Sequence, residues 1–149
     1  MSSDAVGRRM EILLVEDNLT DAGATMEALK QRQVECRVSL VRDGEEAMQF
    51  LHREGIYARA PRPDLILLDL KLPKKNGREV LAEVRSDDQL KNVPVVILTA
   101  SAVHREILKR EELQVDSYMT KPVDFNQFVQ VVKSLRQFWL HERILLPLD

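Results

Sequence analysis

Five short apolar runs, separated by longer amphipathic stretches, place the strongest limit on how this chain can fold. The runs span residues 12–15, 34–41, 65–68, 93–98 and 115–119. Three of them, at 12–15, 65–68 and 95–98, are apolar on both faces, which is typical of strands in a parallel sheet covered by helices on each side. The run at 34–41 alternates apolar and polar residues instead, so we predict a half-exposed edge strand there.

The stretches after these runs carry apolar residues at helical spacing, and each pattern predicts one helix. The five apolar faces are Ala22, Met26 and Leu29; Ala47, Phe50 and Leu51; Val80, Leu81 and Val84; Val103, Ile107 and Leu108; and Phe125, Phe128, Val129, Val132 and Leu135. Asp43 and Asp124 are suited to be helix N-caps, with Glu46 and Gln127 three residues further on. Five strand–helix alternations predict an α/β protein with a flavodoxin-like (βα)5 three-layer sandwich and a parallel sheet of order 2-1-3-4-5.

Length and charge limit the range of functions. The 149 residues suffice for a single domain, with a folded core at about 11–140 and a short apolar tail at 141–149. A formal net charge of −2 creates no positive field for nucleic acid or an anionic membrane. The single cysteine, Cys36, excludes an intramolecular disulfide, and no apolar run approaches the ~20 residues of a membrane span. We therefore expect a cytoplasmic protein that binds neither nucleic acid nor membranes.

The ends of the predicted strands carry polar residues suited to chemistry. Glu16 and Asp17 follow the first strand, Asp69 the third, Thr99 the fourth and Lys121 the fifth. The carboxyl ends of parallel strands meet at one edge of the sheet, where open α/β proteins bind ligands. Three carboxylates at one place repel one another unless a cation joins them. A small number of oxygen ligands favours Mg²⁺, which keeps some of its waters and also binds phosphate oxygens.

A zinc site is not indicated. Cys36 and the three histidines, His52, His104 and His141, do not show the spacing of zinc ligands. We interpret these histidines as ordinary surface residues.

Five motifs, taken in order, resemble those of a known family. They are Leu-Val-Glu-Asp-Asn at 14–18, Asp-Leu-Ile-Leu-Leu-Asp-Leu-Lys-Leu-Pro at 64–73, Asn-Gly at 76–77, Val-Val-Ile-Leu-Thr-Ala at 95–100 and Lys-Pro at 121–122. Together they are similar to the receiver domains of two-component response regulators, over residues from about 11 to 140. The resemblance implies a stand-alone phosphorylation switch that a sensor histidine kinase phosphorylates. It implies no enzyme activity beyond phosphorylation and dephosphorylation of the protein itself.

The resemblance also implies roles for individual residues. Asp69 would be the phosphoacceptor, Thr99 would hold the phosphoryl group and Lys121 would pair with it. Tyr118, three residues before Lys121, matches the aromatic switch position.

A metal site is part of the same resemblance. Glu16 and Asp17 would form the acidic pair that binds Mg²⁺ together with Asp69, and Lys71 would provide a backbone carbonyl. Position 16 is glutamate where many receivers have aspartate, a variation that should only adjust the geometry of the metal.

Three further segments narrow the resemblance. Residues 53–63, 77–81 and 138–140 are similar to the single-domain regulators that pair with cyanobacterial phytochrome kinases. A phytochrome-type histidine kinase is therefore the implied partner.

Two other interpretations stay open. A phosphatase of the haloacid dehalogenase type also uses an aspartate nucleophile, with threonine and lysine at later strand ends. Such enzymes have an Asp-x-Asp motif at the nucleophile, and this chain has Lys71 where the second aspartate would be. Their metal-binding acids also follow the nucleophile in the sequence, whereas Glu16 and Asp17 precede Asp69. The second alternative is a receiver-like scaffold that binds partners without being phosphorylated.

The last predicted helix and the tail indicate self-association. Val131 and Phe138 are seven residues apart on a stripe beside the one that faces the core, and residues 144–148 read Ile-Leu-Leu-Pro-Leu. Contiguous exposed apolar residues usually mark an interface. We therefore predict a homodimer formed through the last helix and tail, with a tail folded back over the sheet edge as the alternative.

Overall fold

The computed structural model of the chain describes residues 9–30 and 36–135. Five parallel strands form one sheet: β1 (Met10–Val15), β2 (Cys36–Val41), β3 (Leu65–Asp69), β4 (Val95–Thr99) and β5 (Ser117–Thr120). Their order is β2-β1-β3-β4-β5, which confirms the predicted topology and the edge position of β2. β4 and β5 begin two residues later than the apolar runs predict, β4 immediately after Pro94, which has no N–H for the sheet. Residues 34 and 35 of the second run lie outside the described residues.

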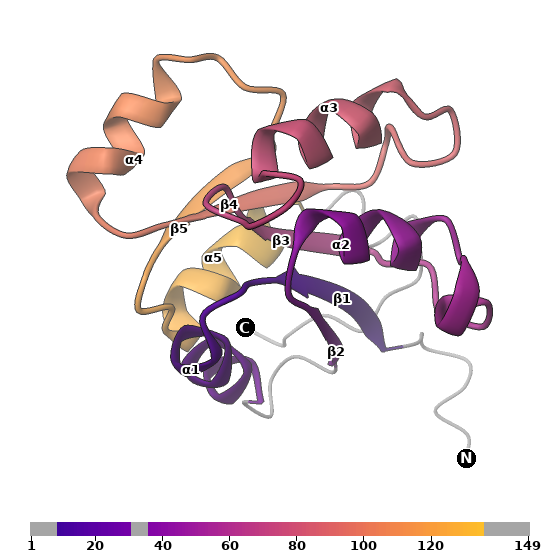
Figure 1. Cartoon of the computed structure of the whole chain (residues 1–149). Helices are drawn as coiled ribbons and strands as arrows, with labels where there is room; N and C mark the ends of the chain where they lie inside the picture. The colour runs from indigo at the N-terminus through magenta and orange to yellow at the C-terminus, as the bar shows by residue number, and fades with distance from the viewer. Residues whose placement is uncertain (1–8, 31–35, 136–149) are drawn as a thin grey trace.

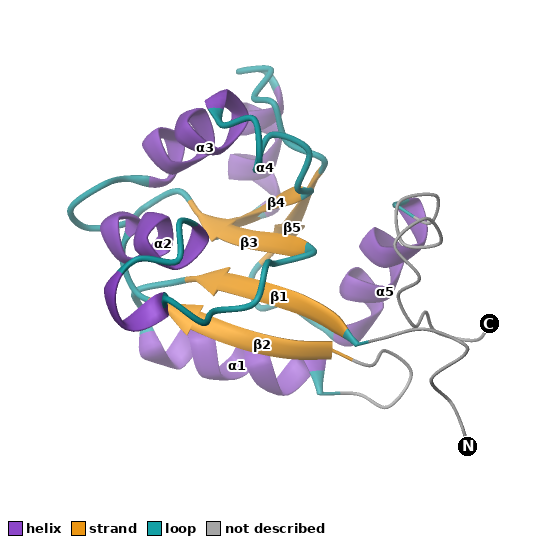
Figure 2. Cartoon of the chain, turned by 90° about the vertical axis from the view of Figure 1, so that its right-hand side faces the viewer, coloured by secondary structure: helices purple, strands orange, loops and turns teal. Residues whose placement is uncertain are grey.

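Helices cover both faces of the sheet (Figure 1). α1 (Leu19–Leu29) and α5 (Phe125–Ser134) lie on one face, and α2 (Gly44–Leu51), α3 (Gly77–Ser86) and α4 (Ala102–Lys109) lie on the other, as Figure 2 shows from a second direction. A 3-10 turn, η2 (Gly55–Tyr57), lies in the crossover from α2 to β3. The predicted three-layer sandwich is confirmed. Within the described ranges, no helix has both the length and the apolar character needed to span a bilayer.

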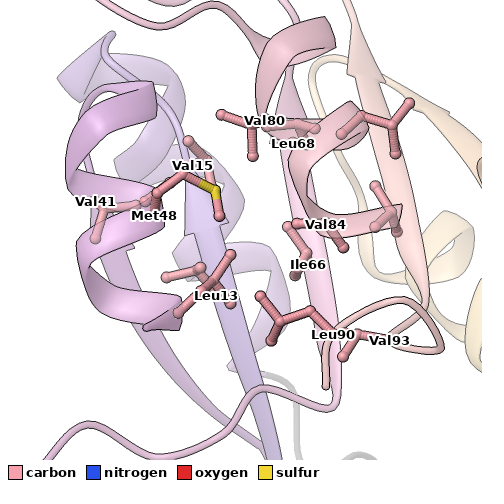
Figure 3. Close-up of a cluster of buried hydrophobic side chains, with 14 of the residues drawn as sticks. Leu13, Val15, Val41, Met48, Ile66, Leu68, Val80, Val84, Leu90 and Val93 are labelled. Atoms are coloured by element: carbon pink, nitrogen blue, oxygen red, sulfur yellow. The ribbon is translucent and has the colours of Figure 1, made fainter. Parts of the chain in front are cut away.

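The central strands bury side chains on both faces, so the core has two halves. In β1, Leu13 and Val15 belong to the half under α2 and α3, whereas Ile12 and Leu14 belong to the half over α1 and α5. Figure 3 shows the first half, in which helix side chains pack against strand side chains: Met48, Val80 and Val84 against Leu13, Val15, Ile66 and Leu68. Each fully buried large apolar side chain contributes about 1.5–3 kcal/mol, so this two-sided packing holds the strand ends firmly in place.

Two helices begin where their sequences predict. The carboxylates of Asp43 and Asp124 accept hydrogen bonds from the backbone N–H groups of Glu46 (2.7 Å) and Gln127 (2.8 Å), which confirms both N-caps. In a complete capping box, the Glu46 carboxylate would accept a hydrogen bond from the backbone N–H of Asp43, and α2 lacks this bond. There the Glu46 carboxylate accepts from the backbone N–H of Arg42, one residue before the N-cap.

α4 packs differently from its prediction. The pattern places Val103, Ile107 and Leu108 toward the core, but only Leu108 is buried, and Val103 and Ile107 are 73% and 50% exposed. The expectation is therefore wrong for these two residues. α4 has only eight residues and lies at the outer edge of the sheet, against β4 and β5, so a narrow stripe is enough to cover that edge (Figure 1).

α5 buries a wider face than its pattern predicts. Val131, expected on an exposed stripe, is only 5% exposed and packs in the same core half as Phe128 and Val132. The prediction that Val131 contributes to a dimer surface is therefore wrong. The reason is that α5 contacts both α1 and β5, so two adjacent stripes of the helix are covered. Phe138 and residues 144–148 lie outside the described residues.

Candidate functional site

The polar ends of the strands meet at one edge of the sheet, as predicted. Glu16 and Asp17 follow β1, Asp69 ends β3, Thr99 ends β4, and Lys121 follows β5. The ends of β3, β4 and β5 are level to within one residue, because Asp69 pairs with Leu98 and Thr99 pairs with Thr120. These five residues line a hollow of about 330 Å³, whose wall also includes Asn18, Asp21, Lys71 and His104.

Asp69 is held in place by donors on both of its carboxylate oxygens. The backbone N–H of Lys71 donates to Oδ1 at 2.8 Å, and Nζ of Lys121 donates to Oδ2 at 2.7 Å. The loop after Asp69 is held by Gly77, where a Cβ would lie 2.6 Å from the carbonyl oxygen of Asp69 and 2.5 Å from Cα of Leu70. Only glycine allows such a close approach of two backbone segments.

A capping box fixes the beginning of α3 beside this loop. The side chain of Asn76 accepts from the backbone N–H of Glu79 at 3.0 Å, and the Glu79 carboxylate accepts from the backbone N–H of Asn76 at 2.9 Å. The N–H of Gly77 also donates to the carbonyl oxygen of Leu70 at 3.1 Å. An N-cap of this type contributes about 0.5–2 kcal/mol. The helix start and the Asp69 loop therefore form one rigid unit.

Lys121 is the cation at the centre of the site. Its Nζ lies 2.5 Å from Oε1 of Glu16, 2.7 Å from Oδ2 of Asp69 and 3.1 Å from Oδ2 of Asp21. Burial by itself lowers the pKa of this ammonium, but the hydrogen bond to Asp69 and the ion pair with Glu16 outweigh burial, and the net effect raises the pKa. Lys121 is therefore charged at neutral pH. Its backbone N–H donates to the carbonyl oxygen of Thr99 at 2.7 Å, which joins the ends of β4 and β5.

Glu16, Asp17 and Asp69 form an acidic cluster in which one oxygen of each lies within 4.8 Å of the others. Glu16 is buried, and burial is the main cause that raises the pKa of its carboxyl group, in opposition to Lys121. Oε1 of Glu16 accepts no well-directed hydrogen bond from any described residue, although the Lys121 charge is close. A buried carboxylate oxygen in this state, beside two other carboxylates, fits a divalent cation that prefers oxygen ligands.

Thr99 and Tyr118 occupy the last two strands. Thr99 is buried, and among the described residues its hydroxyl makes only a long contact of 3.5 Å with the carbonyl oxygen of Ser101. Tyr118 is half-buried, pairs in register with Ile97 and packs against the core half under α2, α3 and α4. Burial, followed by the charge of Glu111, raises the pKa of Tyr118. The weak bond of the Thr99 hydroxyl leaves it able to donate to a new acceptor in the hollow.

The structure brings most of the predicted site residues together. Glu16, Asp17 and Asp69 form the acidic cluster, and Lys121 reaches two of them. Lys71 also lines this hollow, and its backbone N–H donates a hydrogen bond to the Asp69 carboxylate.

Two residues of the hollow were missed by sequence reasoning. Asp21 is four residues after Asp17, and its backbone N–H donates to the side chain of Asn18, the N-cap of α1, at 3.0 Å. An Asn-x-x-Asp pattern directly after a strand is a signal that could have placed Asp21 in the first turn of a helix. His104, which we interpreted as an ordinary surface residue, lines the hollow because α4 begins just before it. No sequence signal distinguishes it from the other histidines.

Comparison with known proteins identifies the family. The model of the response regulator receiver domain matches residues 12–133. The chain is 44% identical over 136 residues to the response regulator Rcp1 of Synechocystis sp., and the match covers 91% of this chain and 92% of Rcp1. A solved structure of the Mn²⁺-bound form of Rcp1 superposes with a TM-score of 0.68 at 43% identity, and covers 93% of this chain and 99% of that one.

Two other solved structures show the same similarity. The bacteriophytochrome response regulator AtBRR has a TM-score of 0.80 at 42% identity, over 89% of this chain and 96% of its own. The phosphorylated cyanobacterial phytochrome response regulator RcpA has a TM-score of 0.70 at 50% identity, over 89% of this chain and 95% of its own. A family match over most of the chain, with relatives this similar over nearly their whole lengths, shows that the chain belongs to the response regulator receiver domain family.

Proposed function

We propose that the protein is a phosphorylation switch in which Asp69 accepts a phosphoryl group from a histidine kinase. The observation that carries this proposal is the position of the Asp69 carboxylate. It lies at the edge of a hollow, with the Lys121 ammonium 2.7 Å from one oxygen and two further carboxylates close by. A nucleophile with a fixed cation beside it and an adjacent cation site is suited to phosphoryl transfer, in which most of the catalysis is positioning and neutralisation of charge.

The reaction balances without a further reagent. A carboxylate oxygen of Asp69 forms a bond to phosphorus as the P–N bond of a phosphohistidine breaks. The electron pair of that bond goes to the imidazole nitrogen, and the ring leaves as neutral imidazole because its other nitrogen carries a proton. The product on Asp69 is an acyl phosphate. Hydrolysis of the acyl phosphate by water returns Asp69 to its carboxylate form.

Lys121 and a metal ion have separate parts in this chemistry. Lys121 provides a fixed positive charge, 2.7 Å from Asp69, that stabilises negative charge on the phosphoryl oxygens. We propose Mg²⁺ as the ion, held by Glu16, Asp17, Asp69 and the backbone carbonyl of Lys71. When it is bound, a divalent cation neutralises charge on the transferring group. The all-oxygen ligands support this assignment, and so does the Mn²⁺ in the Rcp1 structure, an ion with similar ligand preferences.

Thr99 would transmit the change to Tyr118. Within the described ranges, the long contact to Ser101 is the one hydrogen bond that the Thr99 hydroxyl would lose when it donates to a phosphoryl oxygen. New bonds from the phosphoryl group to Thr99 and Lys121 contribute about 1.5–3 kcal/mol each. Their sum of about 3–6 kcal/mol approaches the ~5.5 kcal/mol that inverts a two-state population. Phosphorylation can therefore shift the packing of Tyr118 strongly, and a partner can complete the shift.

A phytochrome-type histidine kinase is the proposed phosphodonor. Support comes from RcpA and AtBRR, which are regulators of phytochrome systems and are 50% and 42% identical to this chain. We place the exchange in the cytoplasm, where the reduced state of the lone Cys36 is expected.

Labelling by a small phosphodonor tests the site. Phosphoramidate with Mg²⁺ should label the wild type, Asp69→Asn should not be labelled, and Asp17→Asn should be labelled more slowly because metal binding is weakened. Asp88→Asn removes the same charge from a remote side chain that is 93% exposed, so it should behave like the wild type. Labelling of Asp69→Asn, or full labelling in EDTA, would contradict the proposed site.

We also propose that the protein forms a homodimer through its apolar tail. The support is the sequence of residues 144–148, since Val131 is buried in the core. Light scattering over a concentration series should show a dimer that truncation after Glu142 weakens. A wild type that stays monomeric at high concentration would exclude this interface.

A further inference from the structure

The Asp21 carboxylate is a third partner of the Lys121 ammonium, and it does not belong to the acidic cluster. Its Oδ2 lies 3.1 Å from Nζ of Lys121 and accepts a hydrogen bond from it. The acidic cluster itself consists of Glu16, Asp17 and Asp69. Asp21 therefore holds the cation of the site without being one of the residues that fit the metal.

The three partners of Lys121 would respond differently to a divalent cation. An ammonium has three N–H donors, and here it has three carboxylate neighbours, Glu16, Asp69 and Asp21. Glu16 and Asp69 belong to the cluster that a divalent cation would join, so much of their charge would be neutralised when it binds. Only Asp21 would keep its full charge for Lys121.

The surroundings of Asp21 suit the role of an anchor. Its backbone is fixed in the first turn of α1 by the hydrogen bond to the Asn18 side chain. Its side chain is 41% exposed, so its charge keeps contact with solvent and the desolvation cost is small. A second hollow, of about 300 Å³, adjoins the pair and is lined by Asp21, Thr25, Lys121 and Pro122 among others. Without Asp21, the long side chain of Lys121 has open space into which it can turn away from Asp69.

We propose that Asp21 is a positioning residue that keeps the Lys121 ammonium beside Asp69 when a divalent cation occupies the acidic cluster. This inference rests on the proposed phosphorylation of Asp69. The proposal predicts that removal of the Asp21 charge changes the phosphorylation rate in the direction opposite to the one that simple charge repulsion predicts. Loss of a negative charge near an anionic phosphodonor should by itself speed the reaction, whereas loss of an anchor for Lys121 should slow it.

The rate of phosphorylation by phosphoramidate at saturating Mg²⁺ shows which of the two directions holds. Asp21→Asn should lower the maximal rate about two- to fivefold, the rate equivalent of a partly exposed ion pair. Asp21→Glu should keep most of the rate, and Asp88→Asn should match the wild type. In a Lys121→Gln background, Asp21→Asn should change the rate by less than about twofold, because the residue it positions is absent. An unchanged or faster rate for Asp21→Asn, or an equal loss in the Lys121→Gln background, would overturn the proposal.

A second readout does not depend on phosphorylation. The Cε–Hε NMR signals of Lys121 are identified as those that are missing from the spectrum of Lys121→Gln. They are followed as Mg²⁺ is added. In the wild type and in Asp88→Asn they should stay distinct from those of exposed lysines, and in Asp21→Asn they should move toward the exposed-lysine positions. Identical Lys121 signals in Asp21→Asn and the wild type at saturating Mg²⁺ would overturn the anchoring role. If the wild type accepts no phosphoryl group, the phosphorylation proposal fails, and these signals still decide whether Asp21 holds Lys121.

Discussion

Replacement of Asp17 by asparagine should stabilise the metal-free protein, even though Asp17 belongs to the proposed metal site. One oxygen of Asp17 lies within 4.8 Å of oxygens of Glu16 and Asp69. Two unit charges at that distance repel by about 0.9 kcal/mol in water and by about 3.5 kcal/mol at an effective dielectric constant of about 20. Lys121 offsets part of this repulsion through its contacts with Glu16 and Asp69. We therefore expect the free energy of unfolding to rise by about 1–2 kcal/mol, which corresponds to a Tm about 3–8 °C higher.

Saturating Mg²⁺ should reverse this order. A ligand that binds only the folded state at a hundred times its Kd stabilises the wild type by about 2.7 kcal/mol. Asp17→Asn has lost one of the three clustered carboxylates and should gain much less. Thermal unfolding followed by circular dichroism, in EDTA and in excess Mg²⁺, measures both effects, with Asp88→Asn as the control for a change of net charge.

Two results would refute this reasoning. If Asp17→Asn is less stable than the wild type in EDTA, repulsion within the cluster does not dominate its energy. If Mg²⁺ raises the Tm of both proteins equally, Asp17 is not a ligand of the metal.

One prediction concerns the loop after Asp69, and another concerns a hydrogen bond between α2 and η2. Gly77→Ala should lower the free energy of unfolding by about 1–3 kcal/mol in a urea titration, because its Cβ would meet the backbone of Asp69 and Leu70. Gly23→Ala, where nothing lies within 4 Å of the new Cβ, should be neutral or stabilising, and equal losses for the two variants would contradict the close approach at Gly77. The phenol of Tyr57 should titrate at about pH 12, because burial and then its hydrogen bond to Glu46 raise its pKa from 10.0 to about 12. Since the folded pKa is the higher one, this group's contribution to stability is complete below pH 10 and is lost as the pH rises toward 12. Ultraviolet titration of Glu46→Gln should show the Tyr57 phenol ionising at a lower pH, and an unchanged curve would exclude the bond as a cause.

The sheet and its reactive edge could be predicted because simple patterns decide them. The runs at 12–15 and 65–68 have no polar face, so they belong in the middle of the sheet, and Glu16 and Asp69 directly after them lie at its carboxyl edge. The alternation at 36–41 likewise predicts the edge strand β2.

Helix packing was less predictable, because periodicity identifies a face but not how widely a neighbour covers it. Val103 and Val131 both follow apolar patterns, yet Val103 is exposed at the outer edge of the sheet and Val131 is buried where α5 meets both α1 and β5. The pairing of Asp21 with Lys121 was missed for a different reason. It joins residues 100 positions apart, and it depends on how far a flexible side chain reaches from the end of β5 to the first turn of α1.

Chemical trapping of the phosphorylated residue tests the central claim most directly. Borohydride reduces an aspartyl phosphate to homoserine, so the modified position can be read from peptide masses after phosphorylation by phosphoramidate in Mg²⁺. We predict homoserine at position 69 in the wild type, and none when the phosphodonor is omitted or EDTA is added. Homoserine at another aspartate, or phosphoryl transfer that leaves Asp69 unmodified, would contradict the assignment of Asp69 as the phosphoacceptor.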